Sequence, residues 1–391
     1  MKLINLQIKK FRAIDQLDLS LLDAIGRPRP ITVVAGPNGS GKTSILFAIV
    51  NALRGVMGYR TADVPVPKPD DIHFSSGDAR KWTREAPKAQ VVLHLKLDED
   101  ELDAIPRLLQ QLEMQPPPPL PDGCLKVTWT FPPGYSDDGT KLGWWTASID
   151  PPHKYIRSWL MARSLAIRAW NRREGQIGPE FLRRIGGLKL FPQDRNLRER
   201  VLPSGIETVP TLNGLVPDGD TDEGREFDAR PFHERTVTDI LHFLSDYAQK
   251  RVPPLPDDQN WEKRVQEIFR DICKPKEYLG YMYRGQEDPV GAPVLKDGDS
   301  EYPLENAASG EQVILEYITR LTHPSPLENS IILVDEPEIH LHPAWIRKLY
   351  LALPRIGNAN QYILTTHADE LRKRAAADNC LIDLGNWGDA E

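Results

Sequence analysis

VVAGPNGSGKTSIL, residues 33–46, carries the clearest structural signal in this chain of 391 residues. It contains the spacing G-x-x-x-x-G-K-[ST] (Gly36, Gly41, Lys42 and Thr43). The apolar run at 31–35 reads as a strand buried on both faces, and residues 42–54 have the pattern of a helix. A glycine-rich loop between such a strand and helix wraps phosphate groups. The stretch therefore predicts a P-loop in an α/β fold with a mostly parallel core sheet.

Each residue type in the loop has a chemical task. Glycines let consecutive backbone N–H groups turn toward phosphate oxygens in conformations that a Cβ obstructs. The following helix presents its positive end to the anion. Lys42 suits the β- and γ-phosphates, and the Thr43 hydroxyl suits Mg²⁺. We expect ATP and Mg²⁺ to be held by the loop and the first helical residues (Gly36, Pro37, Asn38, Gly39, Ser40, Gly41, Lys42, Thr43 and Ser44).

A second stretch, IILVDEPEIHLHPAWI at 331–346, runs an apolar strand into two carboxylates. A Mg²⁺–nucleotide complex needs a carboxylate near the metal and a group that orients or deprotonates water. Asp335, at the end of the strand, suits the metal. Glu336 suits the general base. The two carboxylates therefore predict hydrolysis of the bound nucleotide.

Two histidines, His340 and His342, follow the acidic pair at alternate positions. An H-x-H pattern can bind zinc, but no third ligand is obvious nearby in the sequence. A structural or interfacial role is therefore favoured over a metal site.

These pieces, in this order, resemble the ABC-type ATPase heads of the SMC/RecF/OLD group within the AAA family ATPases. IKKFRAI (8–14) resembles the opening strand of such heads, AASGEQ (307–312) the ABC signature, and TTHADEL (365–371) the switch-histidine segment. The resemblance covers the two ends of the chain. It implies a P-loop NTPase head with an antiparallel N-terminal subsheet. The expected parts are 1–150 for the N-terminal part of the head, 151–305 for an inserted helical lobe, and 306–391 for the C-terminal part.

The resemblance also implies a second phosphate contact. In such heads the signature binds the γ-phosphate of nucleotide held by another subunit, so two copies form a homodimer around ATP. The residues concerned here are Ser309, Gly310, Glu311 and Gln312. Glu311 stands where the usual LSGGQ signature has glycine. Ser309 is expected to cap the helix that begins there, leaving N–H groups that bind an anion.

Three further residues receive roles from the resemblance. His367 would contact the γ-phosphate, so that the catalytic set is Glu336, His367 and Lys42. Arg12 either approaches the nucleotide or lies on the surface. Gln193, after a short apolar run, is a candidate for the glutamine that contacts Mg²⁺. His73 and Gln90 are lesser candidates for that glutamine's place.

The net charge of −7 is unevenly distributed along the chain. Residues 154–200 contain 12 Lys and Arg against four acids, a local charge of +8, which leaves −15 on the remainder. A basic segment in an acidic protein indicates a local anionic partner. Nucleic acid is one such partner. A solvated helix face and pairing with acids elsewhere stay open as alternatives. The candidate contacts are Arg163, Arg168, Arg172 and Arg173.

The sequence favours a cytoplasmic protein without a membrane contact. No apolar run approaches the roughly 20 residues that span a bilayer, and the first residues lack the apolar core of a secretory signal. The cysteines lie far apart, with no CxxC pair (Cys124, Cys273 and Cys380). Since no heptad pattern is sustained, a long coiled coil is not expected. Nor is a C-terminal TOPRIM nuclease domain, because the chain ends soon after His367.

The purpose of ATP hydrolysis is left open by the sequence. One interpretation is a sensor or regulator of a separately encoded effector protein, as in bacterial anti-phage systems that use compact heads. The alternative is a RecF-like DNA-repair ATPase whose dimer holds DNA on the basic segment. A transporter subunit is the weakest interpretation, because the FRAI and EPEIHLHP segments resemble the soluble group.

Overall fold

The computed structural model describes residues 1–57, 89–131, 147–171, 177, 179–191, 193, 261–282, 292–322 and 327–385. The chain divides into two compact units. The first unit contains Met1–Phe191, Leu327–Pro337 and Asn358–Glu391, and the second contains Pro192–Pro326 and Glu338–Gly357. The boundaries at 150 and 305 proposed from the sequence stay a prediction.

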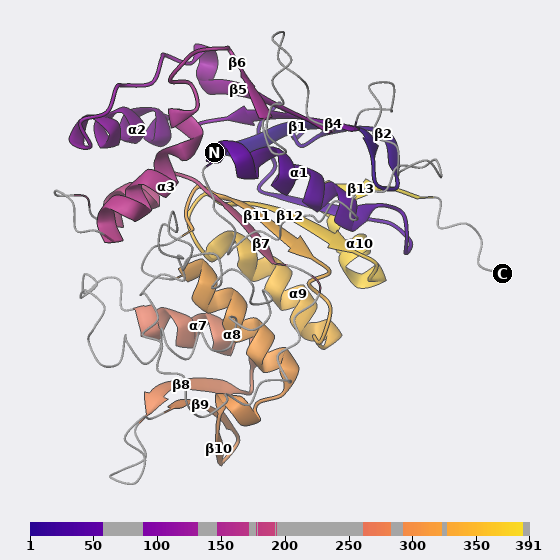
Figure 1. The fold of residues 1–391 in the computed structure, drawn as a ribbon. Helices are drawn as coiled ribbons and strands as arrows, with labels where there is room; N and C mark the ends of the chain where they lie inside the picture. Colours follow the sequence, from indigo (N-terminus) through magenta and orange to yellow (C-terminus); the bar gives the residue numbers. More distant parts are fainter. Residues whose placement is uncertain are drawn as a thin grey trace, which may run out of the picture. The chain divides into compact units, whose positions relative to one another are not determined.

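A parallel five-stranded sheet forms the centre of the first unit, in the order β13-β3-β12-β11-β7 (Figure 1). Every residue of β3, β11 and β12 is buried, which fits strands covered on both faces. Asp335 of β11 pairs with Thr365 of β12, and Thr366 pairs with Ala35 of β3. The carboxyl ends of the three strands therefore meet at one edge. The strands are β3 (Ile31–Ala35), β7 (Leu188–Phe191), β11 (Ile331–Asp335), β12 (Gln361–Thr366) and β13 (Leu381–Asp383).

An antiparallel five-stranded sheet, in the order β2-β1-β4-β5-β6, forms a second layer of the same unit. Its central strands bury apolar side chains on one face and carry polar residues on the other, the alternation expected of a sheet with one solvated face. The strands are β1 (Lys2–Phe11), β2 (Ile14–Ser20), β4 (Ala89–Lys96), β5 (Cys124–Phe131) and β6 (Ala147–Asp150). The predicted mixed α/β fold, with a parallel core and an antiparallel N-terminal sheet, is confirmed.

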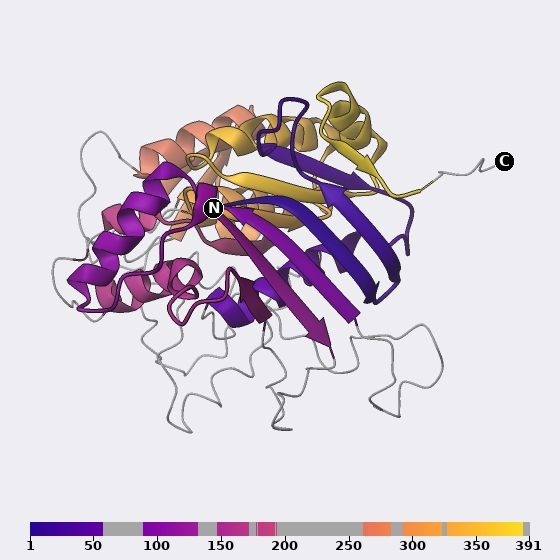
Figure 2. The same cartoon turned by 90° about the horizontal axis from the view of Figure 1, so that it is seen from above.

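Helix α1 (Lys42–Met57) lies between the two sheets and contacts strands of both. Figures 1 and 2 show it running under the antiparallel sheet. Its apolar residues point in several directions, and Ile45, Leu46, Ile49 and Leu53 are at most 1% exposed. A helix that is apolar on most of its surface is a core helix. The P-loop residues before Lys42 therefore lead directly into a buried core helix.

One polar side chain joins the two sheets directly. Gln361, at the start of β12, is fully buried. Its side-chain oxygen accepts the Leu3 N–H at 2.7 Å, and its side-chain nitrogen donates to the Leu3 carbonyl at 2.9 Å. The amide thus pairs with the β1 backbone as a neighbouring strand would, and satisfies two buried polar groups.

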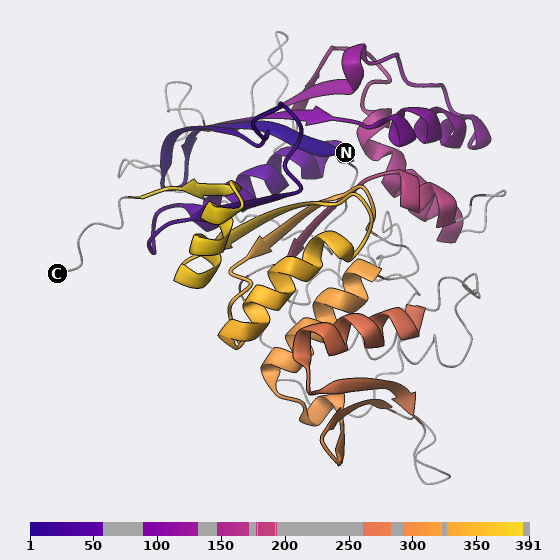
Figure 3. The same ribbon diagram turned by 180° about the vertical axis from the view of Figure 1, so that it is seen from behind.

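Helices α2 (Glu99–Gln111), α3 (Ser158–Asn171) and α4 (Pro179–Arg184) pack with one another, and α3 also contacts α1. A capping box starts α2: Asp98 accepts the Glu101 N–H, and the Glu101 carboxylate accepts the Asp98 N–H. Helix α10 (Asp369–Ala377) contacts β3 and β13 (Figure 3). The short helix η2 (Pro121–Gly123) precedes β5. No helix in the described ranges combines the length and apolar character needed to cross a membrane.

The second unit combines helices with a small sheet. Helix α7 (Trp261–Cys273) contacts α8 (Ser309–Thr322), α9 (Pro343–Ala352) and β8. The three-stranded antiparallel sheet has the order β10-β9-β8, with β8 (Glu277–Met282), β9 (Ala292–Asp297) and β10 (Ser300–Pro303). The short helices η5 (Leu304–Asn306) and η6 (Leu353–Arg355) complete its described part. The helices were expected, whereas the small sheet was not.

Candidate nucleotide-binding site

The P-loop has the backbone that its glycines allow. Gly39 and Gly41 adopt φ values of +82° and +92°, which favour glycine. A Cβ on Gly36 would lie 2.4 Å from the Ser40 Oγ, so the loop closes too tightly for a side chain there. Lys42 is 5% exposed, and its Nζ donates to the Gly36 and Pro37 carbonyls at 2.8 and 3.0 Å. The ammonium group is therefore held against the loop at the positive end of α1.

The P-loop threonine contacts the acidic strand end. Thr43 Oγ1 donates to the two carboxylate oxygens of Asp335, at 3.1 and 3.0 Å. The Thr365 hydroxyl also donates to Asp335, which is 3% exposed. The two predicted metal residues, Thr43 and Asp335, thus lie side by side although they are 292 positions apart in the sequence.

The chemistry of these oxygen atoms fits Mg²⁺. This ion prefers oxygen ligands, retains several waters, and is usually bound through one or two carboxylates together with substrate phosphates. In the described part of the chain, no group of three or more His, Cys, Asp and Glu could hold a metal ion on its own. A hydroxyl beside one carboxylate suits an ion that is shared with phosphate groups.

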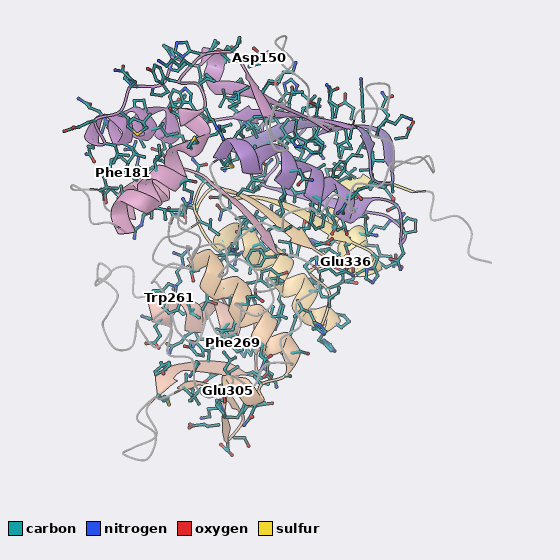
Figure 4. All side chains as sticks on the ribbon, viewed as in Figure 1. Asp150, Phe181, Trp261, Phe269, Glu305 and Glu336 are labelled. Carbon is teal, nitrogen blue, oxygen red and sulfur yellow. The ribbon has the colours of Figure 1, made fainter. Side chains whose placement is uncertain are left out.

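Glu336 is fixed next to the same site. It has a φ of 48°, uncommon for a residue other than glycine. Its N–H contacts the Thr365 carbonyl at 3.2 Å and the Thr365 Oγ1 at 3.1 Å. Its side chain is buried, and its Oε1 lies 3.3 Å from the His367 Nδ1. Figure 4 shows Glu336 at the carboxyl end of the parallel strands. The predicted catalytic residues Glu336 and His367 therefore form a pair in the first unit.

Arg12 lies in the turn between β1 and β2, with a φ of 52°. Its guanidinium carbon lies 4.4 Å from the centre of the Phe47 ring and 5.9 Å from that of Phe11. Phe47 belongs to α1, so the structure places Arg12 against the P-loop helix. A contact between Arg12 and the nucleotide stays a prediction.

Three residues were candidates for the glutamine that contacts Mg²⁺, and they lie in different parts of the chain. Gln193 is exposed, follows β7 by two residues, and belongs to the second unit. Gln90 lies within β4, opposite Thr130 of β5. His73 lies outside the described residues. The metal role of Gln193 stays a prediction.

The predicted signature, residues 307–312, starts helix α8 in the second unit. Within the described residues, the N–H groups of Ser309 and Gly310 have no protein partner, whereas those of Glu311 and Gln312 contact the Ala308 carbonyl at 2.9 and 3.2 Å. Unpaired N–H groups at the first turn of a helix form an anion site together with the helix dipole. The Gln312 side-chain amide donates to the Leu304 carbonyl at 2.9 Å.

The helix cap differs from the prediction. Ser309 is the first residue of α8, not the capping residue before it. Ala308 precedes the helix, and the Glu311 carboxylate accepts its N–H at 3.0 Å. This is the half of a capping box in which the third helical residue reaches back. The Ser309 hydroxyl is therefore not used as a cap, because Glu311 serves that end of the helix.

The histidines after the acidic pair have structural positions. A Cβ on Gly310 would lie 2.7 Å from the His340 carbonyl oxygen and 3.3 Å from the Trp345 ring, so glycine allows this loop to approach the signature. His340 has a φ of 65°. His342 precedes α9, and its Nδ1 accepts the Ala344 N–H at 3.2 Å. The loop therefore shapes the start of α8, while His342 caps α9.

The nucleic-acid role predicted for Arg163 is wrong. Arg163 is 3% exposed, and its Nη1 donates to the Leu182 and Ile185 carbonyls, each at 2.6 Å. These carbonyls lie at the end of α4, where a cation is favourable. The guanidinium is buried and hydrogen-bonded to these carbonyls inside the protein, so it cannot contact a phosphate. Arg168 lies in α3, but its side chain is outside the described set, as are residues 172 and 173.

Sequence reasoning missed Thr365, whose hydroxyl contacts both Asp335 and the Glu336 N–H. The signal was present in the TTH stretch, where a polar residue ends a buried strand next to the acidic strand. It also missed Lys276 and Tyr302, which contact Glu311. No local pattern distinguishes those two residues, because their contacts arise from the small sheet of the second unit.

Two family models match the chain. The model described as "AAA domain, putative AbiEii toxin, Type IV TA system" matches residues 188–372. A second, described as "AAA domain", matches residues 5–131. The first match contains the signature, the acidic pair and the switch histidine, and the second contains the P-loop.

Two curated proteins are similar over parts of their length. The Old nuclease of Escherichia phage P2 is 23% identical over 161 residues, which is 38% of this chain and 27% of the nuclease. The Septu protein PtuA of Bacillus thuringiensis is 43% identical over 61 residues, which is 16% of this chain and 15% of PtuA. The chain thus spans about a quarter or less of the curated relatives that it matches.

Solved SMC heads are also similar. The Smc head bound to the C-winged helix domain of ScpA is 14% identical, with a TM-score of 0.49 over 95% of this chain and 91% of that chain. An Smc head with an extended coiled coil, bound to the C-terminal domain of ScpA from Pyrococcus furiosus, is 13% identical. Its TM-score is 0.49 over 98% of this chain and 93% of that chain.

A P-loop whose threonine contacts the acidic end of another strand of the same parallel sheet defines a domain of the P-loop ATPase class. Both matching family models are AAA domains, and one of the similar proteins is the Old nuclease. The two AAA-domain matches and the partial similarity to the Old nuclease support an SMC/OLD-like ATPase family for this chain.

Proposed function

We propose that the protein binds and hydrolyses ATP, dimerises around it, and regulates a separately encoded effector, in bacterial anti-phage defence. The observation that carries the ATPase part is the cluster at the carboxyl edge of the parallel sheet. There the P-loop Thr43 contacts Asp335, and Glu336 lies 3.3 Å from His367. Groups for a metal ion, a proton acceptor and a phosphate contact are thus gathered on one rigid sheet.

Each residue of the cluster has a task in the proposed reaction. The P-loop N–H groups and the Lys42 ammonium would bind the phosphate oxygens. Thr43 and Asp335 would hold Mg²⁺, which neutralises charge on the phosphates when bound. Glu336 would accept the proton of the attacking water. His367 would orient the Glu336 carboxylate and contact the γ-phosphate, because it is half-exposed beside that carboxylate.

The dimer is supported by the start of α8. Within the described residues, the N–H groups of Ser309 and Gly310 are without a protein partner, and the close approach of the His340 carbonyl requires glycine at 310. An anion would satisfy both N–H groups. We propose that this anion is the γ-phosphate of ATP bound to a second copy. A two-fold pair would complete two equal sites, the symmetry that most homodimers adopt.

The regulatory role is supported by the resemblance to compact ATPase heads and by the similarity to the Old nuclease and PtuA. The matches cover only part of each relative, so the effector in this proposal is a partner protein, not an activity carried over from the relatives. An ATP-dependent change in the dimer would then control that partner.

The RecF-like alternative is weakened by two observations. Arg163 is buried, and Arg184 of the same basic segment pairs with Asp103 at 2.6 Å. The hydrogen bond between these two side chains raises the pKa of the Arg184 guanidinium and lowers the pKa of the Asp103 carboxyl. Part of the positive charge is therefore neutralised within the protein. Exposed basic residues such as Lys154 and Arg157 keep the alternative testable.

Copurification of a Glu336→Gln variant from its native host tests the proposal. The variant is tagged and kept in ATP and Mg²⁺, which should trap the bound state, and both protein and nucleic acid are analysed. A stoichiometric second protein that remains after nuclease treatment supports the regulator. Nucleic acid alone, lost when Lys154 and Arg157 are neutralised, supports the RecF-like alternative and rejects the regulator. A Lys42→Ala variant, unable to hold ATP, is the control for contacts that ignore nucleotide.

A further inference from the structure

Glu311 is a buried carboxylate at the start of the signature helix. It is 1% exposed, and three groups donate to it: the Lys276 ammonium, the Tyr302 hydroxyl at 3.2 Å and the Ala308 N–H at 3.0 Å. Lys276 lies directly before β8, and Tyr302 lies in β10. The small sheet of the second unit therefore holds the carboxylate in place.

This carboxylate creates an electrostatic problem for an anion site. Glu311 follows Ser309 and Gly310, whose N–H groups have no protein partner in the described chain. A negative charge next to these donors repels phosphate, and does so strongly where the surroundings are buried. Binding of a triphosphate at this helix start therefore requires a compensating positive charge.

Lys276 supplies that charge. Its Nζ forms an ion pair with Glu311 and lies 3.3 Å from a carboxylate oxygen of Asp297. Burial lowers the pKa of Lys276, but the hydrogen bond and charge of Glu311 outweigh it and raise the pKa above its usual value, so the ammonium stays charged. Burial, and next the charge of Glu311, raise the pKa of Tyr302 and of the Cys273 thiol. Lys276, next to the small sheet, thus places a positive charge beside Glu311 at the signature.

We propose that Lys276 is a positioning residue for the ATP-bound dimer. It neutralises and anchors Glu311, so that the Ser309 and Gly310 N–H groups can donate to a phosphate of nucleotide held by the partner copy. This inference rests on the proposed ATP-dependent dimer. It assigns the small sheet of the second unit a part in the reaction.

The test measures ATP-dependent association of the full chain by analytical ultracentrifugation, in a Glu336→Gln parent that retains ATP. Lys276→Met should raise the dimer dissociation constant by roughly tenfold or more, in the range of typical coupling between sites. Lys276→Arg should restore association, because it keeps the charge. The double variant Lys276→Met with Glu311→Gln should also recover, since it removes the uncompensated charge while an amide oxygen still accepts from Tyr302 and Ala308.

Two controls separate positioning from folding. Lys296→Met removes a positive charge from β9, and Lys296 makes no ion pair among the described residues, so association should stay at the parent level. ATP affinity of the monomer and thermal unfolding are measured for every variant. If Lys276→Met does not fold, the Lys276→Arg variant and the double variant test the inference. Both are expected to associate in ATP like the parent, and a failure of either folded variant to associate would overturn the inference.

The outcomes are distinguishable. If Lys276→Met associates like the parent, the inference is overturned while the dimer stands. A double variant as weak as Lys276→Met also overturns it, because charge compensation would then not be the cause. If the Glu336→Gln parent itself does not associate in ATP, the proposed dimer fails and the inference fails with it.

Discussion

The P-loop cluster and the signature are both suited to phosphate, yet they are constructed differently. In the cluster the functional groups contact one another: Thr43 with Asp335, and Glu336 with His367. At the signature the contacts go to supporting residues, such as Lys276 and His340, and the Ser309 and Gly310 N–H groups lack a partner among the residues described. The groups of the cluster thus contact one another within one chain, whereas the signature leaves donors that the proposed anion would satisfy.

This difference predicts which variants damage binding by a single copy and which damage only the assembled protein. Variants in the cluster should act on monomers. Variants at the signature should act only when two copies and ATP are present together.

Lys42→Ala should have the largest effect, because it removes the ammonium that the loop holds through the Gly36 and Pro37 carbonyls. We expect ATP affinity to fall by roughly 100-fold or more, as when a charged phosphate contact is lost. Calorimetric titration of the monomer with ATP measures this. Lys9→Ala, on an exposed position of β1, is the matched control. Equal affinities of the two variants would contradict the role of Lys42.

Glu336→Gln should stop turnover and leave ATP binding intact. The amide retains the size of the side chain but cannot accept a proton from water, so we expect the rate to fall roughly 10²–10⁴-fold. Phosphate release at saturating ATP measures this. Glu370→Gln changes an exposed acid three residues after His367 and should keep the parent rate. Normal turnover in Glu336→Gln would refute the assignment of the general base.

Ser309→Arg should separate the two regions most directly. A bulky side chain at the first residue of α8 blocks access to the unpaired N–H groups, while the P-loop in the first unit is untouched. We expect monomer binding of ATP to persist and ATP-dependent association to be lost. Light scattering with and without ATP measures association. Ser300→Arg, at an exposed position of β10, is the control. An unchanged dimer in Ser309→Arg would disprove the two-copy site.

Thr365→Val sharpens the comparison inside the cluster. The substitution keeps the shape of a fully buried side chain but removes the hydroxyl that contacts Asp335 and the Glu336 N–H. Loss of a group that orients a metal ligand typically costs about 10–100-fold in activity. Turnover as a function of Mg²⁺ concentration measures this. Thr366→Val, the next residue of the same strand, is the control and should respond less.

The sequence predicted the cluster because its parts are local motifs on strongly apolar strands. The P-loop glycines, Asp335 and Glu336 each follow a short apolar run of residues that is typical of a buried strand. Parallel pairing of these strands then brings their carboxyl ends together. The signature region was predicted less well. Glu311, not Ser309, serves the helix start, and Lys276 is remote in sequence from the carboxylate that it neutralises.

Arg163 shows why exposure is harder to predict than the helix that carries it. The helix was expected, but a guanidinium on it can face solvent or the carbonyls of a neighbouring helix. The choice depends on the end of α4, where the Leu182 and Ile185 carbonyl oxygens each lie 2.6 Å from the Arg163 Nη1. Charge in a sequence therefore limits where an anion can bind, but packing decides which cations remain available.

Gln361→Leu should have the smallest effect on the reaction and a clear effect on stability. Gln361 joins the parallel sheet to β1 through two hydrogen bonds to Leu3, and leucine would leave the Leu3 N–H and carbonyl buried without partners. Each such group costs about 1–3 kcal/mol in the free energy of unfolding. Urea unfolding measures this, with Gln16→Leu on the exposed face of β2 as control.

Because Gln361 starts β12 and the cluster lies at the other end of that strand, ATP affinity of the folded variant should hardly change. A variant of parental stability but weaker ATP binding would mean that the joint between the sheets shapes the P-loop, and the monomer site would then be less self-contained than its contacts indicate.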